Sequence, residues 1–183
     1  ELRDGDMIRL VVEANEDGYL YVFNSDDRGG AVTMIYPDPR LDGGMNRIRA
    51  HVPYELPSSR ETDPSLRWLH LEGGPVVDVL HLVVSREPLR GVPVGQELAV
   101  WQSSHAESLW SPEGRAWEEI ASRTDAAQDV SLAVNTGTPM TAAERGAIER
   151  TVRLRPSAPA PAVVRMNTSA DAALLVTRVT LTH

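Results

Sequence analysis

The sequence predicts a mainly β fold, an antiparallel β-sandwich of immunoglobulin-like character with one or two short helices in its second half. Residues 5–90 contain several short runs in which apolar and polar side chains alternate. Clusters of Gly, Asn, Asp and Pro separate these runs at the spacing typical of a sandwich. Residues 111–123 instead repeat their apolar side chains with the period of a helix.

The first two predicted strands differ in how much of their surface is apolar. Ile8, Leu10 and Val12 point one way while Arg9 and Glu13 point the other, which is the pattern of a half-buried strand. Residues 19–23 (YLYVF) are apolar on both faces and predict a central strand that is covered on both sides. Gly18 is expected to open this strand at a positive φ. A polar loop containing two glycines then leads into residues 31–36, the returning strand of a hairpin.

Three later runs extend the predicted sheet. They comprise residues 47–52, residues 67–71 and residues 76–85, with a Gly-Gly turn between the last two. In the third run, Leu80 and its i+2 and i+4 neighbours share one face, and His81 points to the other. Residues 5–90 therefore predict about six antiparallel strands.

The second half predicts mixed structure. The predicted elements are a strand at 97–102, a helix that begins with Ser111 as its N-cap and Pro112 at its first position, a short helix that starts with the capping box 141–144, a stiff connector at 156–161, and closing strands at 162–166 and 173–182. The last strand is expected to join the sheet begun by the first strand. We therefore predict one β-rich domain over 1–183, with a core at 5–90 and an extension at 91–183.

Composition excludes several classes of function. The formal net charge of −8 disfavours a nucleic-acid partner, because phosphate binding needs clustered positive charge. The absence of cysteine excludes disulfides and thiol catalysis, and the absence of lysine excludes a P-loop. No apolar run reaches the roughly 18 residues that cross a bilayer, so no membrane insertion is expected. No cofactor is predicted.

The histidines offer only a weak metal site. His70 and His81 fall in strands expected to be neighbours, and Asp78 or Glu72 would complete a ligand set. Asp78, however, is expected on the face opposite His81. Satisfied or exposed histidines are the preferred interpretation, and no metal ligand is predicted.

The sequence also contains one local collection of catalytic residue types. Ser103, Ser104, His105 and Glu107 lie close together, but a catalytic triad is built from residues that converge from separate elements. We therefore interpret this stretch as a polar loop and predict no catalytic residue.

Four tryptophans raise a second possibility, a stacking surface for sugars or peptides. Trp117 is expected in the core of the helix, and Trp68 shares a face with His70. Trp101 and Trp110 complete the set.

Several short motifs occur in a characteristic order. They are Gly5–Asp6, Gly18–Tyr21, Tyr36–Pro37–Asp38, Asn46–Arg47 and Ser85–Pro88. In this order the motifs resemble the bacterial domain of unknown function 4384 family over residues 5–90, with Asp38 in place of the more usual Asn. The resemblance implies an accessory β-domain of a bacterial envelope, secretion or signalling protein, in an extracytoplasmic setting. It carries over no catalytic residue.

We therefore expect a non-catalytic interaction module that binds a protein partner. The candidate binding residues are Trp68, His70, Pro37, Asp38, Asn46 and Arg47. The alternatives are a carbohydrate-binding module that uses exposed Trp and Tyr, and a metal-dependent hydrolase built on His70 and His81. An exposed sheet edge would favour strand addition by a partner.

Overall fold

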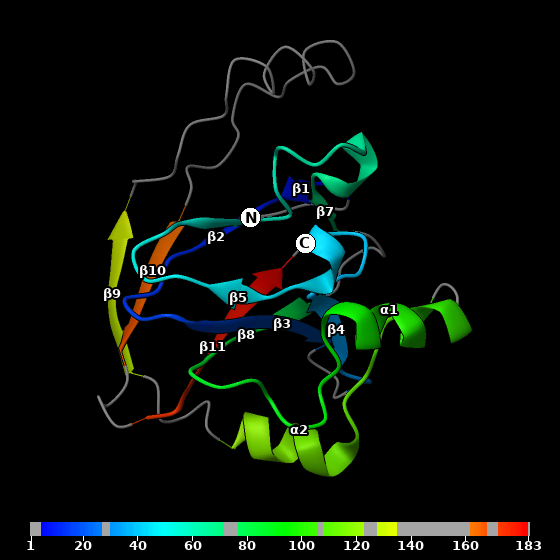
Figure 1. Ribbon diagram of the computed structural model, residues 1–183. Helices are drawn as coiled ribbons and strands as arrows, with labels where there is room; N and C mark the ends of the chain where they lie inside the picture. The colour runs from blue at the N-terminus through cyan, green and yellow to red at the C-terminus, as the bar shows by residue number, and fades with distance from the viewer. Residues whose placement is uncertain are drawn as a thin grey trace.

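The computed structural model describes residues 5–26, 30–71, 77–105, 108–122, 128–134, 162–167 and 172–182. Strands hold far more of the described residues than helices do (Figure 1). The elements in chain order are β1 (Met7–Ile8), β2 (Leu10–Val12), β3 (Gly18–Asp26), β4 (Thr33–Tyr36), the 3-10 helix η1 (Asp42–Gly44), β5 (Arg47–Ile48), β6 (Tyr54–Leu56), the 3-10 helix η2 (Pro64–Leu66), β7 (Leu69–His70), β8 (Val77–Ser85), α1 (Gly95–Ser104), α2 (Gly114–Ala121), β9 (Gln128–Val134), β10 (Ala162–Asn167) and β11 (Leu174–Thr182).

A five-stranded antiparallel sheet forms the centre of the fold. Its strand order is β11-β8-β3-β4, and β5 pairs with the beginning of β3. The side chains of Leu20, Tyr21 and Phe23 in β3 are all 0% exposed, although they point to alternate faces. The prediction of a central strand covered on both sides is confirmed.

The two faces of this sheet are covered by different layers. On one face, Leu20 and Val22 pack with Leu10 and Leu56, which belong to the antiparallel pair β2–β6. This sheet-on-sheet packing gives the fold its sandwich character. The mainly β fold with antiparallel sheets is as predicted.

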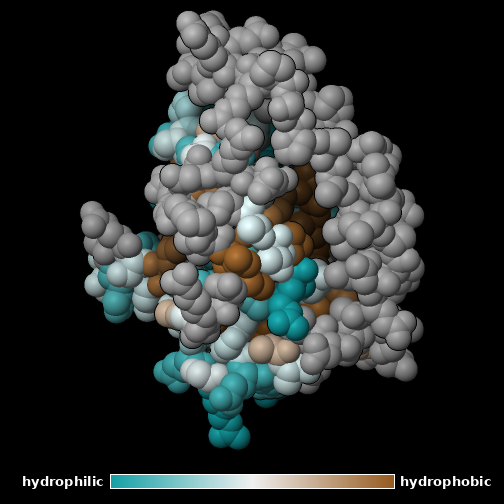
Figure 2. Space-filling view, turned by 180° about the vertical axis from the view of Figure 1, so that it is seen from behind, coloured by the Kyte–Doolittle hydropathy of each residue, from teal (hydrophilic) through white to brown (hydrophobic). Residues whose placement is uncertain are grey.

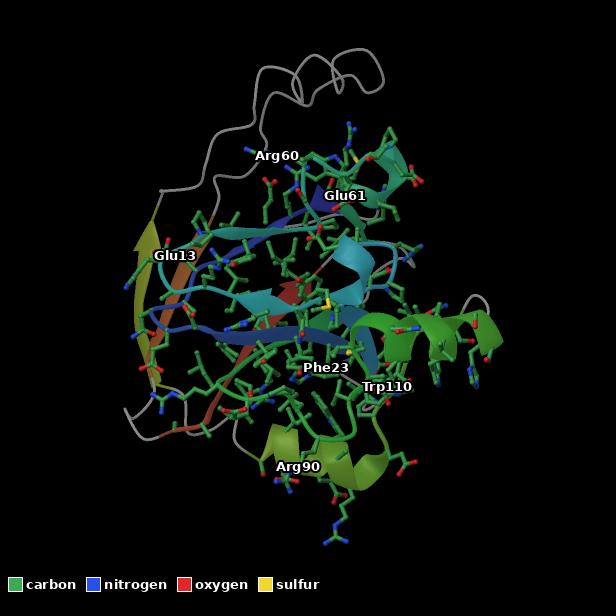
Figure 3. The ribbon with its side chains drawn as sticks, in the orientation of Figure 1. Glu13, Phe23, Arg60, Glu61, Arg90 and Trp110 are labelled. Carbon is green, nitrogen blue, oxygen red and sulfur yellow. The ribbon has the colours of Figure 1, made fainter. Side chains whose placement is uncertain are left out.

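The helices cover the opposite face. Leu98 of α1 and Ile120 of α2 belong to one buried cluster with Tyr21 and Phe23. Figure 3 shows Phe23 and Trp110 together on this helix side of the sheet. None of the described helices is long and apolar enough to cross a membrane.

The prediction of a strand at 97–102 is wrong, because these residues lie inside α1. The alternation that suggested a strand is broken by exposed Val100, whereas Leu98 is only 2% exposed. The helix places Trp101 and Gln102 one turn after Leu98 on the same side. Packing of this side against the protein therefore determines the local structure.

The helix predicted over residues 111–123 exists as α2 but begins later than expected. Its N-cap is Glu113, not Ser111, and Pro112 precedes the helix instead of opening it. The predicted apolar stripe is correct, because Trp117 and Ile120 both pack on the core. The short helix predicted from 141–144 and the connector at 156–161 lie outside the described residues.

The closing strand has a different partner from the one expected. β11 pairs antiparallel with β8 over nine residue pairs, from Leu174 opposite Ser85 to Thr182 opposite Val77. The first strands instead pair with β7 and β6. β8 therefore lies between β3 and β11, with both of its edges paired. Its apolar side chains on both faces fit this central position, because layers cover the sheet on both sides.

The expectation of a positive φ at Gly18 is also wrong, because Gly18 is absent from the left-handed region occupied by several other glycines. A Cβ at this position would lie 2.5 Å from the backbone oxygen of Ser85. Close approach of β3 and β8 therefore requires glycine here.

Candidate functional site

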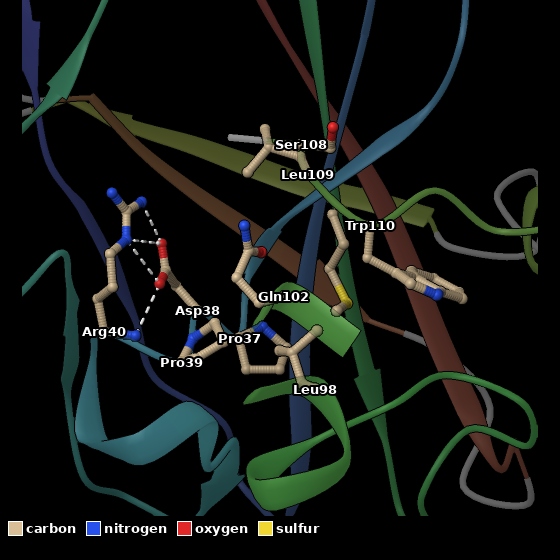
Figure 4. Close-up of a pocket in the computed structure, with 10 residues that line it drawn as sticks. Pro37, Asp38, Pro39, Arg40, Leu98, Gln102, Ser108, Leu109 and Trp110 are labelled. Atoms are coloured by element: carbon tan, nitrogen blue, oxygen red, sulfur yellow. Dashed lines mark hydrogen bonds and ion pairs between the residues drawn. The ribbon is translucent and has the colours of Figure 1, made fainter. Parts of the chain in front are cut away.

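A pocket of about 280 Å³ lies where the loop after β4 meets α1. Its wall on one side is Pro37, Asp38, Pro39 and Arg40 (Figure 4). The remaining lining residues come from β4, from α1 and from the segment before α2: Met34, Leu98, Gln102, Ser108, Leu109 and Trp110. We call this site the β4–α1 pocket.

The loop wall is held in place by Asp38. One of its carboxylate oxygens accepts a hydrogen bond from the Arg40 backbone N–H at 2.8 Å, and the Asp38 carbonyl accepts one from the N–H of Leu41 at 2.9 Å. The Arg40 guanidinium Nε lies 3.0 Å from each Asp38 carboxylate oxygen. Hydrogen bonding to Asp38 raises the pKa of Arg40. This wall is therefore a compact Asp-x-Arg turn whose two charges neutralise one another.

The opposite wall is assembled from two later segments. The backbone N–H of Met34 in β4 donates to the Trp110 carbonyl at 2.7 Å, which fixes the segment 108–110 along the sheet edge. Of the apolar lining residues, Leu98 is buried, whereas Leu109 is 45% exposed. Gln102 stands one helical turn beyond Leu98 on the same side of α1.

The polar groups of the pocket are of two kinds. Asp38 and Arg40 carry opposite charges and satisfy each other. The side-chain amide of Gln102, the hydroxyl of Ser108 and the indole N–H of Trp110 make no hydrogen bond with any residue that the structure describes. The pocket therefore offers unpaired but uncharged donors and acceptors beside an apolar surface, which is suited to an uncharged ligand.

The structure separates the six predicted binding residues. Pro37 and Asp38 line the pocket. Asn46 is 2% exposed, and its side-chain amide donates to the Leu20 carbonyl at 3.1 Å, so it holds β5 against β3. Arg47 is exposed on β5 and does not line the pocket.

Trp68 and His70 lie at a separate place beside the β1–β7 pair. The guanidinium carbon of Arg9 lies 3.9 Å from the centre of the Trp68 ring, and the same guanidinium donates to the Arg67 carbonyl at 3.0 Å. Arg9 also approaches the carboxylate of Glu55 at 3.4 Å. One face of the indole is therefore occupied by Arg9.

The expectation that His70 and His81 lie in neighbouring strands is wrong. His70 in β7 pairs with Met7 of β1, whereas β8, which carries His81, lies between β3 and β11. Among the described residues, no group of three or more His, Asp or Glu side chains gathers to hold a metal ion. Pairing of β7 with the N-terminal strand explains the separation.

His81 is buried on the helix side of the sheet. Its Nε2 lies 2.9 Å from the Ser25 hydroxyl, and its ring meets the ring of Trp117 edge-on with centroids 4.8 Å apart. Burial lowers the pKa of His81 to about 4, and the positive charge of Arg178 acts in the same direction. His81 is therefore neutral at pH 7.

The tryptophans do not form one surface. The Trp101 ring stacks on His105 with centroids 4.4 Å apart, Trp110 lines the pocket, and Trp117 packs on the core. The hydroxyls of Ser103 and Ser104 donate to the Val100 carbonyl within α1 rather than forming a polar loop. Glu107 lies outside the described residues.

Sequence reasoning missed the α1 side of the pocket. Leu98 and Gln102 were placed in a predicted strand, where they would share a face but not approach β4. Their i, i+4 spacing is compatible with a helix as well as with a strand, so it did not distinguish the two. No signal in the sequence indicated that Trp110 would pair with Met34, since these residues are far apart in the chain.

Comparison with known proteins gives a family and no closer relative. Residues 1–88 match the model of the family described as domain of unknown function (DUF4384). No curated protein and no solved structure matches the chain. The matched segment includes every strand from β1 to β8 and the Pro37–Arg40 wall, while α1 and residues 108–110 lie beyond it. The family match over residues 1–88 confirms the resemblance that the order of the sequence motifs indicates.

Proposed function

We propose that this protein is a non-catalytic interaction module that binds an uncharged segment of a protein partner in the β4–α1 pocket. The observation that carries this proposal is the lining of the pocket. An apolar surface formed by Leu98, Leu109 and Trp110 stands beside the side-chain polar groups of Gln102 and Ser108, which bond to none of the described residues. Peptide recognition needs both features, because the side chain is desolvated while the backbone still requires hydrogen bonds.

The size of the pocket favours a peptide anchor over a cofactor. Its volume of about 280 Å³ is just below the range of about 300–1,000 Å³ that is usual for small-molecule sites. A single bulky apolar side chain fits such a space, and the rest of a peptide would run over the rim. The exposed side chain of Leu109 adds apolar surface at that rim.

The charges of the pocket favour an uncharged ligand. Asp38 and Arg40 form an ion pair within one loop, so the site presents no uncompensated charge to an incoming group. A phosphate or a carboxylate would have to compete with Asp38 for Arg40. An apolar residue flanked by ordinary peptide bonds requires no such exchange.

The placement of the histidines supports a non-catalytic role. His70 and His81 belong to different sheets, so the proposed hydrolase would lack its two histidine ligands at one place. The occupied face of Trp68 likewise gives no support to a sugar-binding row. A bacterial, extracytoplasmic setting in an envelope, secretion or signalling protein remains a proposal based on the family resemblance.

We also infer that residues 1–183 form one domain. β11, from the extension, pairs along its whole length with β8 of the family segment. Leu98 and Ile120 of the two helices complete the cluster around Tyr21 and Phe23. Both observations support one shared core, because each half contributes side chains that the other half buries.

The test uses an array of synthetic decapeptides that carry no net charge and a different central residue in each member. The protein is applied as wild type, Gln102→Met, Leu109→Ala and Val100→Ala. The Met variant keeps the side-chain length and removes the amide. Val100→Ala is the matched control, since Val100 is 61% exposed on the same helix and does not line the pocket.

We expect peptides with a bulky apolar centre to bind the wild type and the Val100→Ala control equally. Loss of one hydrogen bond in Gln102→Met should weaken binding about five- to tenfold, as measured by fluorescence anisotropy with the best peptide. Leu109→Ala should weaken it by a similar factor through lost apolar contact. Equal binding by all four proteins, or binding of no array member, would refute the proposed site.

A further inference from the structure

The two edge strands of the central sheet differ in length and in what lies outside them. The edge strand β4 has four residues, and the Trp110 carbonyl accepts the N–H of Met34 from its outer side. The opposite edge strand, β11, has nine residues and pairs with β8. Within the described ranges, no strand lies on the other side of β11.

β11 lacks the features that usually protect such an edge. Proteins guard exposed edges with short strands, prolines, bulges or several charges. The register of β11 with β8 continues without a shift over all nine pairs. The strand contains no proline, and Arg178 is its one charged residue. Its outer row of backbone N–H and C=O groups is therefore regular enough to template another strand.

Apolar side chains lie on both faces of β11. On the helix side, Val176 is 0% exposed and belongs to the cluster around Tyr21. On the other side, Val179 and Leu181 are only partly buried against the cluster around Leu80. In Figure 1, β11 lies behind β3 and β8, and Figure 2 shows hydrophobic surface near the centre of the molecule seen from behind. A further strand would extend both clusters.

We propose that β11 binds an extended segment of a partner protein by strand addition. The backbone of the partner pairs with the outward N–H and C=O groups of β11, and apolar side chains at alternate positions pack beside Val179 and Leu181. This surface is independent of the β4–α1 pocket, because the two lie at opposite edges of the sheet.

Charge favours a different protein over a second copy of this chain. Two β11 strands paired antiparallel about their midpoints would place Arg178 opposite the same residue of the other copy, which is unfavourable. The formal net charge of −8 also opposes association of two identical copies. A segment of a different protein avoids both charge repulsions and therefore fits the β11 edge better than a second copy does.

The probe is a fluorescein-labelled synthetic peptide with the sequence of residues 77–85. It copies β8, whose antiparallel register with β11 is known. We expect saturable binding to the full chain by fluorescence anisotropy, together with slower amide hydrogen exchange in residues 174–182. The same peptide with N-methyl groups at alternate residues is the control, because it cannot donate the ladder hydrogen bonds and should bind at least tenfold more weakly.

Two proline variants test the edge itself. Adjacent residues of an antiparallel strand direct their N–H groups to opposite sides, so one of Val179 and Thr180 donates inward and the other points outward. Of Val179→Pro and Thr180→Pro, we expect one to lose thermal stability and the other to keep it while binding the probe at least tenfold more weakly.

Three outcomes would overturn the proposal. The first is that the wild type shows no saturable binding of the probe. The second is that the proline variant that keeps its stability binds as tightly as the wild type. The third is strong protection of the outward-pointing amides of 174–182 before any peptide is added, since only the inward-pointing ones pair with β8. Light scattering at increasing protein concentration then separates two explanations. Association shows that a second copy covers the β11 edge, and a constant monomer mass shows that this chain itself covers it.

Discussion

The imidazole of His81 meets the indole of Trp117 edge-on, with ring centroids 4.8 Å apart. The contact joins the middle of β8 to α2. Packing of this kind leaves His81 only 7% exposed. Ser25 faces the same imidazole from β3, and Arg178 faces it from β11. A proton added to His81 would thus be buried beside a positive charge.

Stability should fall as the pH is lowered from 7 to 5. The pKa of His81 is about 4 in the folded protein, below its ordinary value of 6.5, so the unfolded chain binds the proton first. Stability is then fully present above pH 6.5 and is lost as the pH falls toward 4. We expect His81 to contribute a loss of about 2 kcal/mol between pH 7 and pH 5 in urea unfolding. His81→Gln should remove this part, and an identical pH slope in the variant would contradict the assignment.

Gly18→Ala should destabilise the sheet. The added Cβ would lie 2.5 Å from the Ser85 carbonyl oxygen, so β3 and β8 must separate. The expected loss is about 2 kcal/mol in thermal or urea unfolding. Gly114→Ala is the control, since a Cβ there meets nothing within 4 Å at the start of α2. If the two variants were equally stable, the close approach of β3 and β8 would not be the reason for glycine at position 18.

Tyr21→Phe should cost about 1 kcal/mol of stability. The Tyr21 hydroxyl accepts a hydrogen bond from the Leu89 N–H at 3.0 Å and ties the chain after β8 to the central strand. Tyr54→Phe removes a similar bond at 2.9 Å, from the exposed Arg49 N–H, and should cost less because water can replace it. Urea unfolding of both variants measures the difference, and the reverse order of the two losses would contradict it.

Asp38→Asn should be milder than Asp38→Ala. An Asn side-chain oxygen can still accept the Arg40 backbone N–H, whereas Ala loses both this bond and the ion pair. Arg40 is mostly exposed, so its ion pair with Asp38 is worth only about 0–1 kcal/mol. We expect Asp38→Ala, but not Asp38→Asn, to weaken peptide binding at the pocket. Similar binding by both variants would mean that the turn does not depend on the Asp38 side chain.

Local sequence patterns predicted which segments form strands better than they predicted which strands pair with one another. The apolar character of residues 19–23 on both faces correctly indicated a central strand, since few other environments bury both sides. The pairing of β11 with β8 depends on contacts between distant segments, which periodicity does not specify. α1 was missed because Leu98 alone among its apolar residues is deeply buried, so the helical stripe is weak.

The candidate site was predictable in part. The sequence indicates Pro37 and Asp38 because a loop that starts with a proline follows a predicted strand. Gln102 and Trp110 reach the same pocket only through tertiary packing, so no local motif marked them. Asn46 belongs to a family motif, yet its side chain is used to hold the sheet together.

The pairing of β8 with β11 has a practical consequence for protein expression. A recombinant fragment that stops at residue 88, where the family match ends, would lack β11 and both helices. It would present Tyr21, Phe23 and Val83 to water, although all three are 0% exposed in the intact chain. Such a fragment should precipitate or recruit a chaperone. The stretch that matches the family model is therefore shorter than the stretch that must be synthesised to obtain a soluble product.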